Sequence, residues 1–151
     1  ANDAAGSLAE KRLEMRNLEP LLAIGRAPKV VEHGALELVT PAGKKVTGYI
    51  VQERVEGREL GAMLADRAAA ARALKEARAL FEDLIAARIK LEDRVKMSEN
   101  IVIDRKAWVL DAGEAAKVAP QSRFDKLLGR PDPLRVYYDG LLAEYSRRAG
   151  I

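Results

Sequence analysis

The sequence predicts an α+β protein, because segments with a helical period alternate with short hairpin patterns along the chain. Its 151 residues are enough for a hydrophobic core, and 48% hydrophobic with 32% charged residues is the balance of an ordinary globular protein. The same alternation argues against a coiled coil or an array of repeats.

The first part of the chain predicts one helix and one hairpin. Leucines recur at roughly helical spacing over residues 7–19, and Pro20 should interrupt this helix before a further turn or two. Residues 35–40 and 46–54 alternate in polarity, and the turn Pro41-Ala42-Gly43-Lys44 between them predicts a β-hairpin.

The remainder of the chain is expected to be mainly helical. A short helix is predicted over residues 59–66, followed by a long alanine-rich helix over residues 67–88 with its large apolar side chains near one face. A short helix over residues 123–129 should precede the last helix, residues 134–148, for which Asp132 is positioned as the N-terminal cap.

A second hairpin is predicted between the long helix and the last one. Residues 101–103 and 108–110 are short apolar strands, and the polar turn 104–106 joins them. Antiparallel pairing would bring Asn100 and Asp111 to the same end of this hairpin. An amide and a carboxylate side by side could bind a hard cation such as Mg²⁺. The alternative is a surface hairpin with polar ends.

The composition of the chain limits the kinds of partner and metal site that can be expected. The formal net charge is only +3 and basic residues are interspersed with acidic ones, so no nucleic-acid partner is expected. The absence of cysteine excludes disulfides and thiolate metal sites, and the single histidine, His33, excludes a His-rich metal site. No apolar run approaches the roughly 20 residues that cross a bilayer, so no membrane span is expected.

The second hairpin and its flanks resemble the metal-binding half of the protein-kinase-like superfamily. Ser98-Glu99-Asn100-Ile101-Val102-Ile103-Asp104 resembles the family's Pro-Glu-Asn-Ile-Leu-Ile-Asp, and Leu110-Asp111-Ala112-Gly113 resembles its Asp-Phe-Gly motif with Ala for Phe. The resemblance implies that Asn100 and Asp111 are the two Mg²⁺ ligands.

Two further segments resemble parts of the same family. Val55-Glu56-Gly57-Arg58-Glu59-Leu60 resembles the hinge between the kinase lobes, which implies that Glu53, Arg54 and Val55 lie beside the adenine of ATP. Residues 14–28 resemble the third helix of the small lobe, which implies that Glu14 is the helix glutamate that pairs with a strand lysine. The alternatives are a strand end with a glycine turn, and a solvated glutamate on an amphipathic helix.

The segment that matches the catalytic loop departs from the family. Val95 falls where the family has its catalytic aspartate, and a valine cannot accept a proton. Asp93 lies two residues upstream and could replace it, while Lys96 could contact a phosphate oxygen or be a surface lysine. No Gly-rich phosphate loop and no strand lysine precede the first helix in this sequence.

The resemblance implies a kinase-like fold in two parts. Residues 1–55 would form a reduced small lobe of one helix and a hairpin, and residues 56–151 a minimal, mainly helical large lobe that carries the metal-site hairpin. The implied activity is phosphotransfer from ATP with Mg²⁺, of the Ser/Thr-protein-kinase-like type, with incomplete catalytic machinery.

Two alternatives stay open. One is a pseudokinase-type protein-interaction module without catalysis, and the other is an unrelated α+β domain whose hairpin mimics the motif. Compact kinases without a long activation segment occur among secreted bacterial effectors. The expected location is therefore the cytoplasm, or a host cell into which the protein is secreted as an effector, and the expected partner is a protein or a protein substrate.

Overall fold

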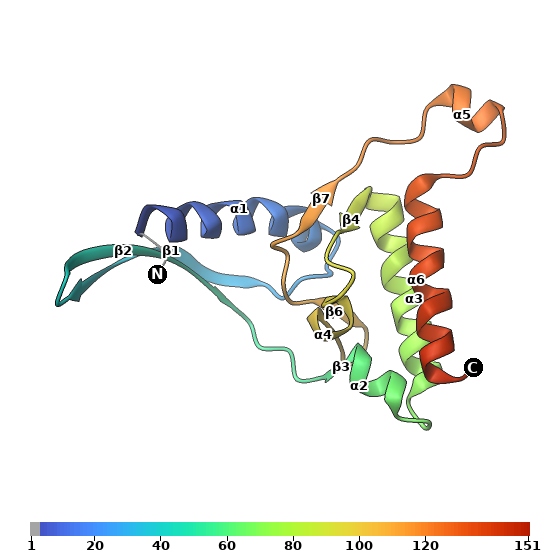
Figure 1. Cartoon of the computed structure of the whole chain (residues 1–151), viewed down its shortest axis with the longest axis horizontal. Helices are drawn as coiled ribbons and strands as arrows, with labels where there is room; N and C mark the ends of the chain where they lie inside the picture. The colour runs from blue at the N-terminus through green and yellow to red at the C-terminus, as the bar shows by residue number, and fades with distance from the viewer. Residues whose placement is uncertain (1–3) are drawn as a thin grey trace.

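The computed structural model describes the backbone of residues 4–151 and the side chains of residues 8–151, and within these residues the fold is α+β, as predicted (Figure 1). The elements in chain order are α1 (Ala4–Ala23), β1 (Val30–Thr40), β2 (Gly43–Gln52), β3 (Arg58–Glu59), α2 (Leu60–Ala65), α3 (Ala70–Ala87), β4 (Ile89–Leu91), α4 (Met97–Asn100), β5 (Ile101–Ile103), β6 (Ala107–Val109), β7 (Ala115–Lys117), α5 (Arg123–Leu127) and α6 (Pro133–Ala149).

Helix α1 is longer than predicted and is not interrupted. It begins at Ala4 and continues past Pro20 to Ala23, so the predicted start at residue 7 and the break at Pro20 are wrong. Pro20 has no backbone N–H, so the carbonyl four residues earlier loses its helical hydrogen bond. Burial of Leu18 and Leu21 against the core offsets that loss.

The β1–β2 hairpin is also longer than predicted and projects beyond the body of the protein (Figure 1). Its register ends at Thr40 opposite Gly43, and Gly43 has a φ of 119°, which favours glycine. Helix α1 packs on β2, where a Cβ added at Gly48 would lie 2.6 Å from Cβ of Lys11. Glycine at this position is therefore what allows the helix to approach the strand closely.

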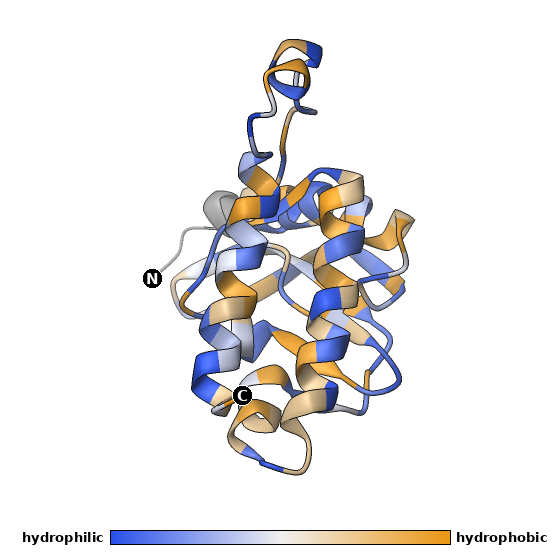
Figure 2. Ribbon diagram, turned by 90° about the vertical axis from the view of Figure 1, so that its right-hand side faces the viewer, coloured by the Kyte–Doolittle hydropathy of each residue, from blue (hydrophilic) through white to orange (hydrophobic). Residues whose placement is uncertain are grey.

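The rest of the chain is built around the paired helices α3 and α6 (Figures 1 and 2). Phe81 of α3 stacks on Tyr138 of α6 with ring centroids 4.7 Å apart. The Tyr145 ring also lies next to Phe81, with its centroid 6.3 Å from that of Phe81. All three rings are buried. Aromatic pairs in these arrangements stabilise by about 0.5–1.5 kcal/mol beyond the area that they bury.

Strand β4 is held between β7 and two tyrosines of α6. Lys90 opposes Ala116 in the antiparallel β4–β7 pair and directs its backbone groups toward β7. The carbonyl of Ile89 and the N–H of Leu91 therefore point the other way, toward α6. The Tyr138 hydroxyl accepts a hydrogen bond from Leu91 N at 3.0 Å and donates to Ile89 O at 2.8 Å. The Tyr137 hydroxyl donates to Leu91 O. Two phenols therefore occupy the place of a neighbouring strand.

The predicted second hairpin is formed by β5 and β6, with Ile101 opposite Val109 and Ile103 opposite Ala107. Strand β5 also pairs with β3, so it lies in the middle of a three-stranded sheet, and its side chains are buried. The residues between β2 and β3, where the predicted boundary at residue 55 falls, form no helix or strand.

Arg26 connects the end of α1 to two other parts of the protein. Arg26 is buried, its carbonyl accepts from Val109 N at 2.7 Å, and its guanidinium donates to Ala107 O at 3.1 Å. The guanidinium also forms an ion pair with Asp83 of α3, at 2.8 Å. Arg26 therefore connects α1, the β5–β6 hairpin and α3.

The segment between β7 and α6 leaves the body of the protein and carries α5 at its outer end (Figure 1). Asp132 caps α6 as predicted, because its Oδ1 accepts from Leu134 N at 3.1 Å. Within the described residues, no helix is long and apolar enough to cross a membrane.

Candidate functional site

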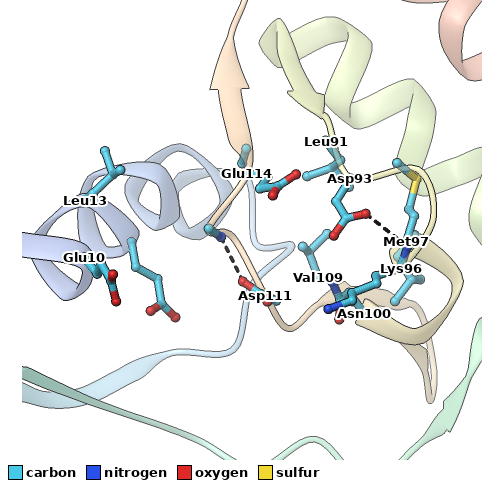
Figure 3. Close-up of a pocket in the computed structure, with 14 residues that line it drawn as sticks. Glu10, Leu13, Leu91, Asp93, Lys96, Met97, Asn100, Val109, Asp111 and Glu114 are labelled. Atoms are coloured by element: carbon cyan, nitrogen blue, oxygen red, sulfur yellow. Dashed lines mark hydrogen bonds between the residues drawn. The ribbon is translucent and has the colours of Figure 1, made fainter. Parts of the chain in front are cut away.

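A pocket of about 370 Å³ lies between α1, the segment that follows β4, and the open end of the β5–β6 hairpin (Figure 3). Five residues singled out from the sequence line it together: Glu14, Asp93, Lys96, Asn100 and Asp111. They come from three separate segments of the chain, namely α1, residues 93–100 and the residue after Leu110, so only the fold brings them together.

Asn100 and Asp111 are positioned by the hairpin that the sequence predicts. Asn100 is the last residue of α4, and its carbonyl accepts from Leu110 N at 2.8 Å, which extends the pairing by one step beyond Ile101 and Val109. The Oδ1 atom of Asp111 accepts from the Gly113 amide at 2.9 Å, and this bond fixes the carboxylate at the pocket edge.

The donor types at this position fit Mg²⁺. Carboxylate and amide oxygens are hard ligands, and Mg²⁺ commonly takes one or two protein groups and completes its shell with water and phosphate. Among the described residues, no group of three or more His, Cys, Asp and Glu side chains could hold a metal ion. Asn100 and Asp111 would therefore provide a partial coordination shell rather than a closed protein cage.

Asp93 lines the pocket, whereas the residue at the position of the family's catalytic aspartate does not. Val95 is 89% exposed and lies in the turn before α4. Asp93 is half-buried, and its Oδ1 accepts from Lys96 N at 3.2 Å, which orients the carboxylate (Figure 3). The turn therefore points an acid two residues upstream of Val95 into the pocket.

Helix α1 forms the opposite wall. Glu14 accepts from Lys11 Nζ at 2.9 Å, one turn away on the same helix. Asn17 Nδ2 donates to Gly113 O at 3.0 Å and connects α1 directly to the segment after Asp111. Glu14 therefore has a lysine partner, but that lysine is on a helix and not on a strand.

The pocket contains acidic residues that sequence reasoning missed. Glu10 and Glu114 line it together with Glu14, Asp93 and Asp111, and Lys96 is the basic residue among the described lining residues. Glu10 precedes Glu14 by four positions, which places both on one helix face. Glu114 directly follows the Asp-Phe-Gly-like motif. These two positions are the sequence signals that could have indicated Glu10 and Glu114 as pocket residues.

The three residues predicted to lie beside adenine line a different pocket. Glu53, Arg54 and Val55 border a cavity of about 680 Å³ at the turn end of the β5–β6 hairpin, with Trp108 and Lys106. The structure does not bring them to the pocket of Asn100 and Asp111.

Asp104 and Lys106, in the turn that borders the larger cavity, both have hydrogen-bond partners. Lys106 Nζ lies 4.4 Å from the Trp108 ring centroid and donates to Gly25 O at 2.6 Å. Burial opposes ionisation of Asp104, but hydrogen bonds from Trp108 Nε1, Lys106 N and Arg105 N outweigh it and lower the pKa of Asp104. The polar groups of the turn thus hold the wall of this cavity in place.

No family model matches the sequence, and no curated protein matches it significantly. Two solved structures of WbdD resemble the chain, with TM-scores of 0.49 and 0.48 at 20% and 21% identity, and WbdD is described as a bifunctional kinase-methyltransferase. Each match covers 95% of this chain, which spans only 37% and 36% of the two WbdD chains.

Proposed function

We propose that this chain is a kinase-like phosphotransferase of the Ser/Thr-protein-kinase-like type that uses ATP and Mg²⁺, with incomplete catalytic machinery. In this proposal residues 1–55 are a reduced small lobe and residues 56–151 a minimal large lobe. The observation that carries it is that Asn100 and Asp111, which resemble the family's metal ligands, line one pocket together with Asp93.

Each of the five lining residues that the sequence singled out has a proposed role. Asn100 and Asp111 would hold Mg²⁺, which when bound neutralises phosphate oxygens of the nucleotide. Asp93 orients the acceptor hydroxyl and takes its proton, and Lys96 contacts a phosphate oxygen. Glu14, paired with Lys11, takes the position of the family's helix glutamate.

The nucleotide is proposed to lie along the β5–β6 hairpin. Its adenine contacts Glu53, Arg54 and Val55, and its phosphates reach the end marked by Asn100 and Asp111. The two pockets contact opposite ends of this hairpin, whose strands of three residues each span roughly 10 Å.

The charge of the smaller pocket makes the cation essential in this proposal. Five carboxylates line it against Lys96, and two like charges 4 Å apart repel by about 4 kcal/mol at an effective dielectric constant near 20. A polyphosphate without a metal ion is therefore expected to bind much more weakly than the Mg²⁺ complex.

The experiment measures ATP binding by calorimetry with and without Mg²⁺, on the wild-type chain, on Asp111→Ala and on Asp139→Ala. Asp139 is an exposed acid on α6 outside the pocket and serves as the matched control. We expect Mg²⁺-dependent binding that Asp111→Ala weakens by at least about tenfold, or roughly 1.4 kcal/mol, and that Asp139→Ala leaves unchanged. Absence of nucleotide binding in the wild-type chain would contradict the proposal.

A non-catalytic binding module is the second candidate, and the exposed Val95 at the matched catalytic position favours it. The two candidates differ in turnover. If radiolabelled phosphate is transferred from ATP, Asp93→Asn should abolish most of the transfer while nucleotide affinity stays within about twofold. Mg²⁺-dependent binding without any transfer would favour the module.

A further inference from the structure

The arm between β7 and α6 exposes three large apolar side chains at its outer end. Phe124 is 63% exposed, Leu127 is 84% exposed and Leu128 is 54% exposed, and all three lie on or directly after α5. Figures 1 and 2 show this end standing away from the rest of the molecule, with hydrophobic and hydrophilic residues side by side. We refer to residues 123–130 as the tip.

The tip is an ordered structure and not a loose loop. Ser122 caps α5 by accepting from Asp125 N at 3.1 Å, and Gln121 Nε2 donates to Arg130 O at 2.7 Å across the base of the tip. Below this base, Arg88 donates to Asp132 at 2.6 Å. The exposure of the apolar side chains is therefore built into the fold, at a cost in apolar area left in water.

Basic residues surround these apolar side chains. Arg123 and Lys126 are exposed, and within the described residues neither side chain forms an ion pair or a hydrogen bond. Arg130 lies 5.7 Å from the Phe124 ring centroid and pairs with Asp125, which is the sole acid in residues 121–130. The tip therefore combines an apolar end with a net positive surrounding charge.

We propose that the tip inserts into the surface of an anionic lipid bilayer. Apolar side chains that project beyond a basic collar match a membrane interface, where acyl chains lie below negatively charged headgroups. The three apolar side chains expose on the order of 400 Å². The net positive charge around these side chains is complementary to anionic headgroups, and this charge complementarity is what favours a bilayer as the partner.

The test is co-sedimentation of the full chain with vesicles of phosphatidylcholine alone and of equimolar phosphatidylcholine and phosphatidylserine. The tip variant is Phe124→Ser with Leu127→Ser, and the charge variant is Arg123→Gln with Lys126→Gln. The matched control is Leu36→Ser with Val39→Ser, which changes apolar residues of the β1–β2 hairpin that are 50% and 82% exposed.

We expect binding to the anionic vesicles that the tip and charge variants each weaken by about tenfold, because both apolar insertion and headgroup attraction contribute. The hairpin control should bind like the wild-type chain. Equal binding by the wild-type chain and the tip variant, or no binding by the wild-type chain, would overturn the proposal. Self-association that the tip variant abolishes, without vesicle binding, would overturn it and assign the tip to a protein contact.

A second readout reports insertion directly. The chain contains no cysteine, so Leu127→Cys and Val39→Cys each provide a single attachment point for an environment-sensitive fluorophore. Anionic vesicles should shift the emission of the label at position 127 to the blue and leave the label at position 39 unchanged. Equal shifts at both positions would also overturn the proposal.

Discussion

Two buried tyrosines on the same helix should respond in opposite ways to loss of the hydroxyl. Tyr138 and Tyr145 both lie on α6, both are buried, and both rings neighbour Phe81. The Tyr138 hydroxyl bridges Leu91 N and Ile89 O, whereas the Tyr145 hydroxyl is buried without a hydrogen-bond partner in the described part of the chain. Phenylalanine at either position preserves the ring.

The hydrogen bonds lost with each hydroxyl determine how far the free energy of unfolding should change. Tyr138→Phe removes two bonds and leaves a buried amide and a buried carbonyl of β4 unsatisfied. At about 1 kcal/mol for each bond, we expect the free energy of unfolding to fall by about 2–3 kcal/mol. Tyr145→Phe removes a polar group that already lacks a partner, so the free energy of unfolding should stay unchanged or rise by up to about 1 kcal/mol.

Chemical denaturation monitored by circular dichroism measures the free energy of unfolding of both variants. The comparison is valid if the slope of this free energy against denaturant concentration is the same as in the wild-type chain. The reasoning is wrong if the two variants are destabilised equally, because the rings and their burial are matched and only the hydroxyl partners differ. Tyr138→Phe has a second expected effect. Leu91 lies two residues before Asp93, so loosening β4 should also lower any phosphotransfer activity.

The remaining predictions concern pH, one ion pair and two glycines. Burial raises the pKa of Tyr145 to about 12, above its usual value of 10, so its contribution to stability is full below pH 10 and is lost as pH rises toward 12. That loss should reach about 2–3 kcal/mol in alkaline denaturation curves, and Tyr145→Phe should abolish this share. The hydrogen bond from Arg88 lowers the pKa of Asp132, so this carboxylate stabilises above pH 3.8 and its contribution disappears as pH falls further. Asp132→Ala, which removes a helix cap and a half-buried ion pair, should cost about 1–3 kcal/mol in urea denaturation at neutral pH and little in strong acid. Gly57→Ala would place Cβ 2.5 Å from a carbonyl oxygen of β5 and should destabilise by about 1–3 kcal/mol, whereas Gly140→Ala meets no atom within 4 Å in α6 and should stabilise by about 0.5–1 kcal/mol in thermal denaturation. Equal effects at the two glycines would contradict the steric explanation.

The local parts of the fold could be read from the sequence because local residues determine them. The β5–β6 hairpin follows from two apolar triplets around a polar turn, and the cap at Asp132 follows from an acid directly before Pro133. The pairing of β4 with β7 joins segments with weak patterns that lie 26 residues apart, so no local signal predicted it. The position of Pro20 inside α1 was missed because tertiary burial outweighed the local preference.

In the candidate site, too, the features set by local residues were predictable and those set by tertiary packing were not. Residue spacing around the hairpin is consistent with Asn100 and Asp111 lining one pocket, since antiparallel pairing fixes which ends of two strands meet. The contribution of Glu10 depends on where α1 lies against the rest of the chain, and no sequence pattern determines that, whereas Glu114 directly follows Gly113 and could have been inferred from that position. The separation of Glu53–Val55 from this pocket likewise depends on the path of a segment without regular structure.

The anchoring of α1 by Arg26 makes this helix a lever. Glu14 lies nine positions before Ala23, the last residue of α1, or roughly 14 Å along the helix at 1.5 Å per residue. A swing of about ten degrees at that end of the helix would move Glu14 by roughly 2 Å relative to Asp111. Burial of Leu18 and Leu21 in the core, the close packing of α1 on β2 at Gly48 and the exposed hydrogen bond from Asn17 to Gly113 all oppose such a swing. The width of the pocket therefore depends on how firmly the whole helix is held, and a substitution far from Asp111, at Arg26 or Gly48, would change the distance between its acidic walls.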